Sequence, residues 1–223
     1  MNLAEELALI GYHDDGRPAT DGLHLDNGLG GAVLLELALF EKVDVDDNRV
    51  VVRDPAPTGN AVLDAALDRI ARDKPRKPKY WVSKFSKGTR EQVMAGLVAQ
   101  GVVREEKGKV LLLFPRTRYP AAHGAEPVAE TEARQRVRAA VAGNGQVEPR
   151  TAALCALLAA TDLDKKVFAD LERRQVKARL KEIGKGEWAA VAVKKAIDEV
   201  RAAVMASIIA SSSAATAGSG GSS

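Results

Sequence analysis

The hydrophobic positions of the chain recur mainly at the spacing of α-helices, about three or four residues apart. The run over residues 32–40 is apolar apart from Glu36 and predicts a core helix, with Asp26 or Asn27 as its N-cap. Other helices are expected over residues 2–10, 57–71, 88–100, 128–142, 151–160, 163–168, 173–183 and 188–210. The expected fold class is therefore mainly α: one helical domain over residues 1–210 with two β-hairpins, and a low-complexity, disordered tail over residues 211–223.

Two segments show the pattern of β-hairpins. In residues 42–54, valines alternate with polar residues on either side of Asp47 and Asn48, which are typical turn formers. The second hairpin is expected in VVREEKGKVLLLF, residues 102–114, with a turn at Gly108 and a strand over residues 110–114. Five consecutive apolar residues break the alternation that a strand with one wet face would show. Either both faces of this strand are covered by protein, or one face meets a partner chain or a lipid.

The apolar strand of the second hairpin needs cover on both faces. Alternation would direct Leu111 and Leu113 to one face, and Leu112 and Phe114 to the other. We expect one pair to pack on the helical body. The other pair would then contact a second protomer or the acyl region of a membrane, unless both faces are covered within the monomer.

Composition limits the classes of partner. The chain has 33 basic and 30 acidic residues, so a basic binding surface must be local. No run of about 18 apolar residues occurs, and MNLAEELALIGY lacks the basic start of a signal peptide. We therefore expect a cytoplasmic protein whose membrane contact, if any, is peripheral. The single cysteine, Cys155, lies in the apolar run LCALLAA and is expected to be a buried, inert thiol, as suits a reducing compartment.

Residues that would indicate catalysis or metal binding are scarce. The three histidines are expected in loops, and none has metal-ligand spacing: His13, His24 and His123. The block HLDNGLGG is neither a dinucleotide fingerprint nor a phosphate-binding loop, so its glycines are expected to allow close helix packing: Gly28, Gly30 and Gly31. Glu5 and Glu6 are expected on a solvated helix face. The sequence therefore predicts no enzyme, no metal and no cofactor.

The most basic stretch is RDKPRKPKYWVSKFSKGTR, residues 72–90, with eight lysines or arginines and one acid. If the chain is helical from Lys84 onward, then Lys84, Lys87 and Arg90 share one face and form a phosphate site. Trp81 and Phe85, one turn apart, would then anchor the helix in the core. The alternative is a charge run that is merely solvated.

Four blocks of the sequence together resemble one known family: LAEELALIGY, GLGGAVLLELAL at residues 28–39, DPAPTGNAVLDAAL at residues 54–67, and TREQVMAGLVAQGVVREEKGKVLLLF at residues 89–114. The chain is similar in these blocks to the Golgi phosphoprotein 3 family, the phosphatidylinositol 4-phosphate effectors of the eukaryotic Golgi, which also has bacterial members. The resemblance extends over most of residues 3–210. Abundant Ala, Gly, Val and Arg suggest a bacterial, actinobacterial-type member.

The resemblance implies a helical, non-catalytic domain with a basic phosphoinositide pocket and a projecting, hydrophobic second hairpin for membrane contact or self-association. Alignment on GLVAQGVV places two basic pocket residues of the family at Lys87 and Arg90. Lys84 would add charge, and Trp81 is a conjectured substitute for the family's pocket tryptophan, which has no match near Asp21. The arginine of the eukaryotic Gly-Leu-Arg-Gly block is also missing, because Gly30 stands in its place.

These observations predict a non-catalytic peripheral membrane protein that binds phosphoinositides or other anionic phospholipid head groups. One alternative is a nucleic-acid-binding protein, since a helix followed by a hairpin also ends a winged helix-turn-helix. That alternative is disfavoured because residues 88–100 contain few base-reading groups. A second alternative is a structural scaffold whose hairpin binds another protein. Self-association through the hairpin is a further expectation.

Overall fold

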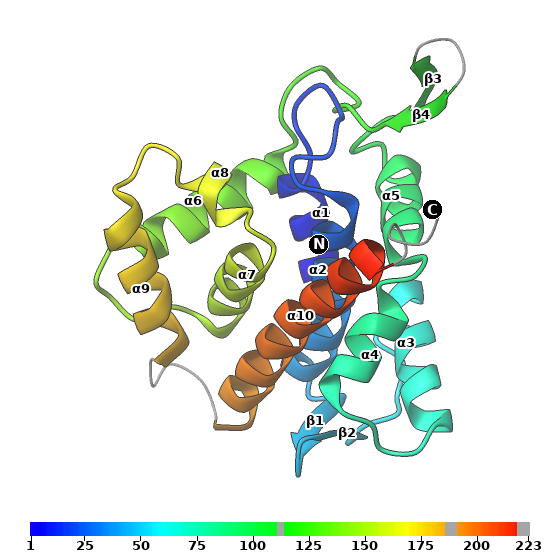
Figure 1. Cartoon of the computed structure of the whole chain (residues 1–223), viewed down its shortest axis with the longest axis vertical. Helices are drawn as coiled ribbons and strands as arrows, with labels where there is room; N and C mark the ends of the chain where they lie inside the picture. Colours follow the sequence, from blue (N-terminus) through cyan, green and yellow to red (C-terminus); the bar gives the residue numbers. More distant parts are fainter. Residues whose placement is uncertain (111–113, 186–190, 218–223) are drawn as a thin grey trace.

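The computed structural model describes residues 1–110, 114–185 and 191–217, and these form a mainly helical body with two small antiparallel sheets (Figure 1). The helices are α1 (Leu3–Ile10), α2 (Gly22–Leu39), α3 (Ala61–Arg72), α4 (Pro78–Phe85), α5 (Thr89–Ala99), α6 (Val128–Ala142), α7 (Pro149–Ala160), α8 (Asp164–Val167), α9 (Arg173–Lys185) and α10 (Val191–Ala217). The strands are β1 (Val43–Asp46), β2 (Arg49–Val52), β3 (Glu106–Val110) and β4 (Phe114–Arg118). The predicted fold class is confirmed.

Helix α2 is the centre of the body, packing against α1, α3, α4, α5, α7 and α10. It begins earlier than predicted, because the Asp21 side chain caps it by accepting a hydrogen bond from the His24 amide at 2.9 Å. The prediction of Asp26 or Asn27 as N-cap is therefore wrong, and both residues lie inside the helix. His24 also lies in α2, not in a loop.

Three glycines of α2 bring its backbone against three different neighbours. A Cβ atom at Gly28 would lie 2.4 Å from Thr161 Cγ2, and one at Gly31 would lie 2.4 Å from Val204 Cγ2. A Cβ atom at Gly30 would lie 2.5 Å from the carbonyl oxygen of Val82 and 2.9 Å from the amide nitrogen of Ser86. The prediction that these glycines allow close packing is confirmed, and at Gly30 the contact is backbone against backbone.

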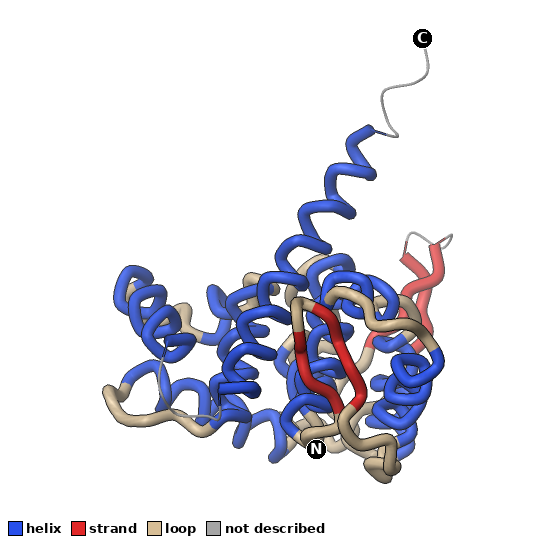
Figure 2. The backbone as a smooth tube through the Cα atoms, turned by 90° about the horizontal axis from the view of Figure 1, so that it is seen from below, coloured by secondary structure: helices blue, strands red, loops and turns tan. Residues whose placement is uncertain are grey.

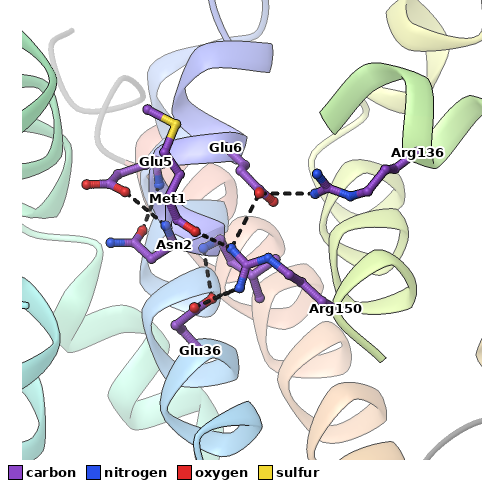
Figure 3. Close-up of polar contacts among 8 residues, drawn as sticks. Met1, Asn2, Glu5, Glu6, Glu36, Arg136 and Arg150 are labelled. Atoms are coloured by element: carbon purple, nitrogen blue, oxygen red, sulfur yellow. Dashed lines mark hydrogen bonds and ion pairs between the residues drawn. The ribbon is translucent and has the colours of Figure 1, made fainter. Parts of the chain in front are cut away.

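A buried network of charges holds the N-terminus on α2 (Figure 3). Glu36 is 1% exposed; its carboxylate accepts a hydrogen bond from the Leu3 amide and another from Arg150, each at 2.8 Å. Arg150 also donates to the Met1 carbonyl at 2.6 Å and lies 3.4 Å from Glu6. The network therefore joins the chain terminus, α1, α2 and α7.

The two acids of α1 are part of the packed interior. Glu5 is 7% exposed and closes a capping box with Asn2, while Glu6 is 5% exposed and pairs with Arg136 at 3.0 Å. The prediction of a solvated face for both residues is wrong. Helix α1 is covered by neighbours all round, so its polar side chains are buried together with their partners.

The first hairpin confirms its prediction. Val43 pairs with Val52 and Asp46 with Arg49, and Asp47 and Asn48 turn the chain with φ values of 44° and 56°. Two consecutive residues with positive φ match the right-handed twist of the flanking strands. Asn and Asp tolerate this conformation better than most other residues that carry a side chain.

The second hairpin differs from its prediction in register. Gly108 lies within β3 opposite Arg116, and Val110 pairs with Phe114. The predicted turn at Gly108 and the predicted single strand over residues 110–114 are therefore wrong, since Val110 and Phe114 belong to opposite strands. Leu111, Leu112 and Leu113 lie outside the described residues, and of Phe114 only the backbone is described. The hairpin projects from the body, as expected (Figures 1 and 2).

The C-terminal half follows its predicted helices closely, but α10 continues to Ala217, beyond the predicted end near residue 210. Its last turns extend away from the body (Figure 2). Cys155 is buried in α7, and burial raises the pKa of its thiol to about 12, in agreement with the predicted inert thiol. No helix in the described part of the chain has both the length and the hydropathy that a membrane crossing requires.

Replacement of Gly30 by alanine should destabilise the fold. The added methyl group meets the α4 backbone, which cannot rotate away, and overpacking of this kind costs about 1–3 kcal/mol. Gly96→Ala is the matched control, because a Cβ atom at Gly96 in α5 has no atom within 4 Å. It should stabilise the protein by about 0.5–1 kcal/mol through helix propensity. Urea unfolding measures both free energies, and equal effects would contradict the backbone contact.

Loss of Arg150 should be costly because it leaves two buried carboxylates without their shared partner. We expect Arg150→Met to lower the free energy of unfolding by about 3–5 kcal/mol, as for other broken buried ion pairs. Arg72→Met is the control, since Arg72 pairs with Asp68 on the surface, where such pairs contribute less than about 1 kcal/mol. Similar losses in the two variants, measured by urea unfolding, would contradict a structural role for the network.

Candidate functional site

The basic segment of residues 72–90 folds as the end of α3, a connection, the short helix α4 and the first turn of α5. Pro78 occupies the first turn of α4, and Gly88, with a φ of 84°, separates α4 from α5. Lys84, Lys87 and Arg90 therefore do not share one helix face as their spacing predicted. They come from the last turn of α4, from the connection, and from the first turn of α5.

The aromatic residues of the segment hold α4 in place. Trp81 is 1% exposed and stacks on buried Phe85, with ring centroids 5.5 Å apart. Tyr80 packs edge-on against Trp81 and carries the guanidinium of Arg76 over its ring at 4.9 Å. The prediction that Trp81 and Phe85 anchor the helix is confirmed. The indole of Trp81 faces the interior, and its Nε1 has no hydrogen-bond partner among the described residues.

The lysines of the segment face water instead. All five are exposed, and none forms an ion pair with any residue that the structure describes: Lys74, Lys77, Lys79, Lys84 and Lys87. The arginines at the two ends of this array are already engaged, since Arg72 pairs with Asp68 and Arg90 with Asp26. The positive charge available to a ligand is therefore carried by lysines.

Arg90 is half-buried beside the start of α2. Its Nη2 donates to Asp26 at 2.7 Å, and the guanidinium lies against Gly22 and beside Tyr12. Burial alone would lower the pKa of Arg90, but Asp26 and Tyr12 outweigh it and raise that pKa. Burial also raises the pKa of Asp26, and Arg90 offsets this only in part. The side chain of Arg90 remains 25% exposed, so a ligand could reach it by competing with Asp26.

Tyr12 connects Arg90 to the second hairpin. Its ring packs edge-on against Tyr119, the residue directly after β4, at a centroid distance of 5.7 Å. Burial raises the pKa of Tyr12, although Arg90 lowers it in part. The base of the projecting hairpin and the guanidinium of Arg90 therefore lie on one face of the molecule.

The missing family arginine has a physical explanation in the packing of Gly30. A side chain there would start inside the contact between α2 and the backbone at the end of α4. An arginine would therefore require the two helices to separate. The family's tryptophan has no match near Asp21. In this chain Asp21 is the N-cap of α2.

The first turn of α5 adds a second source of positive potential. Gly88 is its N-cap and has no side chain to accept hydrogen bonds from the first amide groups. Thr89 does not cap these amides, because its hydroxyl donates to the carbonyl of Phe85. Uncapped amides at a helix N-terminus favour phosphate and other anions. Glu91 in the same turn opposes this effect in part.

Sequence reasoning missed Asp26 as the partner of Arg90. The sequence indicates Asp26 only as a possible N-cap. The only sequence signal for this pairing is that Asp26 is an acid five residues after the N-cap, Asp21. Within the described residues, no group of His, Cys, Asp or Glu is placed to hold a metal ion.

Comparison with known proteins identifies the family. The model of Golgi phosphoprotein 3 (GPP34) matches residues 3–200. Vacuolar protein sorting-associated protein 74 of Eremothecium gossypii is 29% identical over 147 residues, which cover 55% of this chain and 44% of that protein. The chain thus spans less than half the length of this relative. Because the family model covers most of its length, the chain belongs to the Golgi phosphoprotein 3 (GPP34) family, whose members include lipid-binding, non-enzymatic proteins.

Proposed function

We propose that the protein binds anionic phospholipid surfaces peripherally through the basic segment, on the inner face of the cytoplasmic membrane. The observation that carries the proposal is that the five lysines of the basic segment are exposed and form no ion pair with a described residue, and that Lys84 and Lys87 lie next to the uncapped start of α5. Each cation near an anionic membrane surface contributes roughly 1 kcal/mol. The array therefore supplies enough attraction for reversible binding without any buried lipid.

Lys87 and Lys84 are the proposed phosphate ligands of this surface. Lys87 directly precedes Gly88, so a phosphate at the start of α5 can contact both the ammonium group and the free amides. Arg90 would join by exchanging Asp26 for the phosphate. Trp81 is buried and would contribute by holding α4 in place. A phosphoinositide and a simpler anionic lipid both satisfy this chemistry.

The second hairpin is the proposed membrane or protomer contact. It projects from the body on the side of α5, and its base is joined to Arg90 through Tyr119 and Tyr12 (Figure 1). An approach that places the basic segment on an anionic surface would also bring residues 110–114 close to it. Leu111, Leu112, Leu113 and Phe114 would then enter the acyl region, or contact a second copy of the chain.

Removal of Lys84 and Lys87 should weaken binding to anionic vesicles. The protein should sediment with phosphatidylglycerol vesicles at low salt and remain in solution with phosphatidylcholine. Lys84→Ala/Lys87→Ala should bind at least about tenfold more weakly, because two surface cations are lost. Arg174→Ala/Lys195→Ala is the control, since it removes two exposed cations elsewhere that form no ion pair with any described residue. Equal sedimentation with both vesicle types, or equal losses in both variants, would refute the proposal.

Release of Arg90 from Asp26 should strengthen binding. Asp26→Asn removes the competing carboxylate, so we expect a several-fold higher affinity for phosphatidylglycerol vesicles. When Arg90 is already replaced by alanine, Asp26→Asn should raise the affinity for these vesicles less. The gain then comes only from the removal of one negative charge from the surface. This double-mutant cycle isolates the contribution of the guanidinium. A loss of affinity in Asp26→Asn would instead mean that Asp26 must hold Arg90 in place for binding.

A further inference from the structure

A second charged cleft lies away from the basic segment, between α7, α9 and α10. Its cavity volume is about 810 Å³, within the range of about 300–1,000 Å³ that is typical of ligand pockets. In Figure 1, α7 and α9 lie on one side of α10, and α4 and α5 lie on the other. The cleft is therefore separate from the surface proposed to meet the membrane.

The floor of the cleft is apolar. Small side chains of α7 form it, with Ala156 and Ala159 partly open to the space and Cys155 buried beneath. Leu180 of α9 and Ile197 of α10 flank this floor. Burial raises the pKa of Cys155 to about 12, so its thiol adds no charge. The part of a ligand that lies on this floor must therefore be apolar.

The walls of the cleft, in contrast, are charged and mostly basic. Arg173, Lys177 and Lys181 of α9 are each four residues apart and so lie on one helix face. Lys194 and Arg201 of α10 are seven residues apart, which is about two turns. Seven basic and three acidic residues line the cleft in all. Two cationic stripes therefore flank an apolar floor.

The acids of the cleft neutralise only its end near α8. Asp162 pairs with Lys165 at 2.9 Å, and Asp164 pairs with Arg173 at 2.7 Å. Among the described residues, no ion pair is formed by the cations further along the walls, Lys177, Lys181 and Arg201, or by the one remaining acid, Asp198. Like charges brought together in a cleft repel each other, and a bound anion removes this cost.

We propose that this cleft binds an amphiphilic anion with a single acyl chain. The chain lies on the alanine floor of α7, and its carboxylate or phosphate lies between Lys181 of α9 and Arg201 of α10. The volume and the apolar floor suit a hydrocarbon chain, and the cations that form no ion pair with a described residue favour a negative head group. The proposal does not depend on the membrane-binding function of the basic segment.

Calorimetric titration of the whole chain tests the proposal with defined probes. Oleate and 1-oleoyl-lysophosphatidate, each below its micelle concentration, should bind with one molecule per chain. Inorganic phosphate and 1-oleoyl-lysophosphatidylcholine should bind at least about tenfold more weakly. Inorganic phosphate has no acyl chain, and lysophosphatidylcholine has no net negative charge. Tighter binding of lysophosphatidate would identify a phospholipid as the source of the ligand, and tighter binding of oleate would identify a fatty acid. Failure of both anionic amphiphiles to bind would overturn the proposal.

Matched variants locate the site. Lys181→Ala/Arg201→Ala should lose at least about tenfold in affinity, because the head group loses a cation on each wall. Arg174→Ala/Lys195→Ala removes one cation from each of the same helices outside the cleft and should bind normally. Lys84→Ala/Lys87→Ala should also bind normally, which separates this site from the basic segment. Equal losses in the two cleft-helix variants would overturn the proposal.

A floor variant tests the acyl chain separately. Ala156→Phe places a ring in the space over α7 while every charge remains, so both anionic amphiphiles should bind more weakly. Circular dichroism melting shows whether each variant is folded. If Ala156→Phe is unfolded, Ala159→Phe replaces it as the floor variant. Unchanged binding in a folded floor variant would overturn the proposal.

A competition experiment tests an acidic peptide as the ligand instead. If polyglutamate displaces oleate at a lower concentration than lysophosphatidate does, the cleft binds acidic peptides and the proposal is overturned.

Discussion

The close approach of α2 to its neighbours is the constraint on which the rest of the structure depends. Gly28, Gly30 and Gly31 leave three parts of the helix surface without side chains, and the α7 end, α4 and α10 occupy them. The contact at Gly30 transmits position most directly, because there the backbone of α2 packs on the backbone at the end of α4, and backbones cannot adjust as flexible side chains do. The position of the α4–α5 connection, and with it the exposed lysines, is therefore set by a glycine in the core.

The charged side chains divide into two groups by environment. Arginines make the contacts of the buried network and of the start of α2, as at Arg150 with Glu36 and at Arg90 with Asp26. Their planar guanidinium groups can satisfy two acceptors at once and are less strongly hydrated than ammonium groups. Lysines of the basic segment remain in water without partners. Net charge is thus a poor guide to this protein, since arginines such as Arg150 serve the fold, while the five lysines of the basic segment form no ion pair with a described residue.

Much of the fold follows from local sequence, and the errors share one physical cause. Helices α6, α7 and α9 and the Asp47–Asn48 turn have short-range patterns, and these were predicted. The start of α2, the buried acids of α1 and the break at Gly88 depend on tertiary contacts that a single sequence does not display. Asn27 and the glycines of α2 indicate a loop by propensity, but packing on all sides overrides that preference. The candidate site residues follow from spacing and resemblance and stay a prediction, whereas the contact between Arg90 and Asp26 is visible only in the fold.

The departure at Gly30 changes the kind of recognition that the basic segment can provide. A pocket that discriminates the position of a phosphate needs several fixed donors directed to one point, usually arginines with bidentate geometry. Here the backbone of α4 excludes an arginine at residue 30, and Arg90 already shares its charge with Asp26. Flexible lysines respond to the density of negative charge, and in about 0.1 M salt their attraction extends over only about 10 Å. The geometry therefore favours recognition of anionic surfaces in general over recognition of one head group.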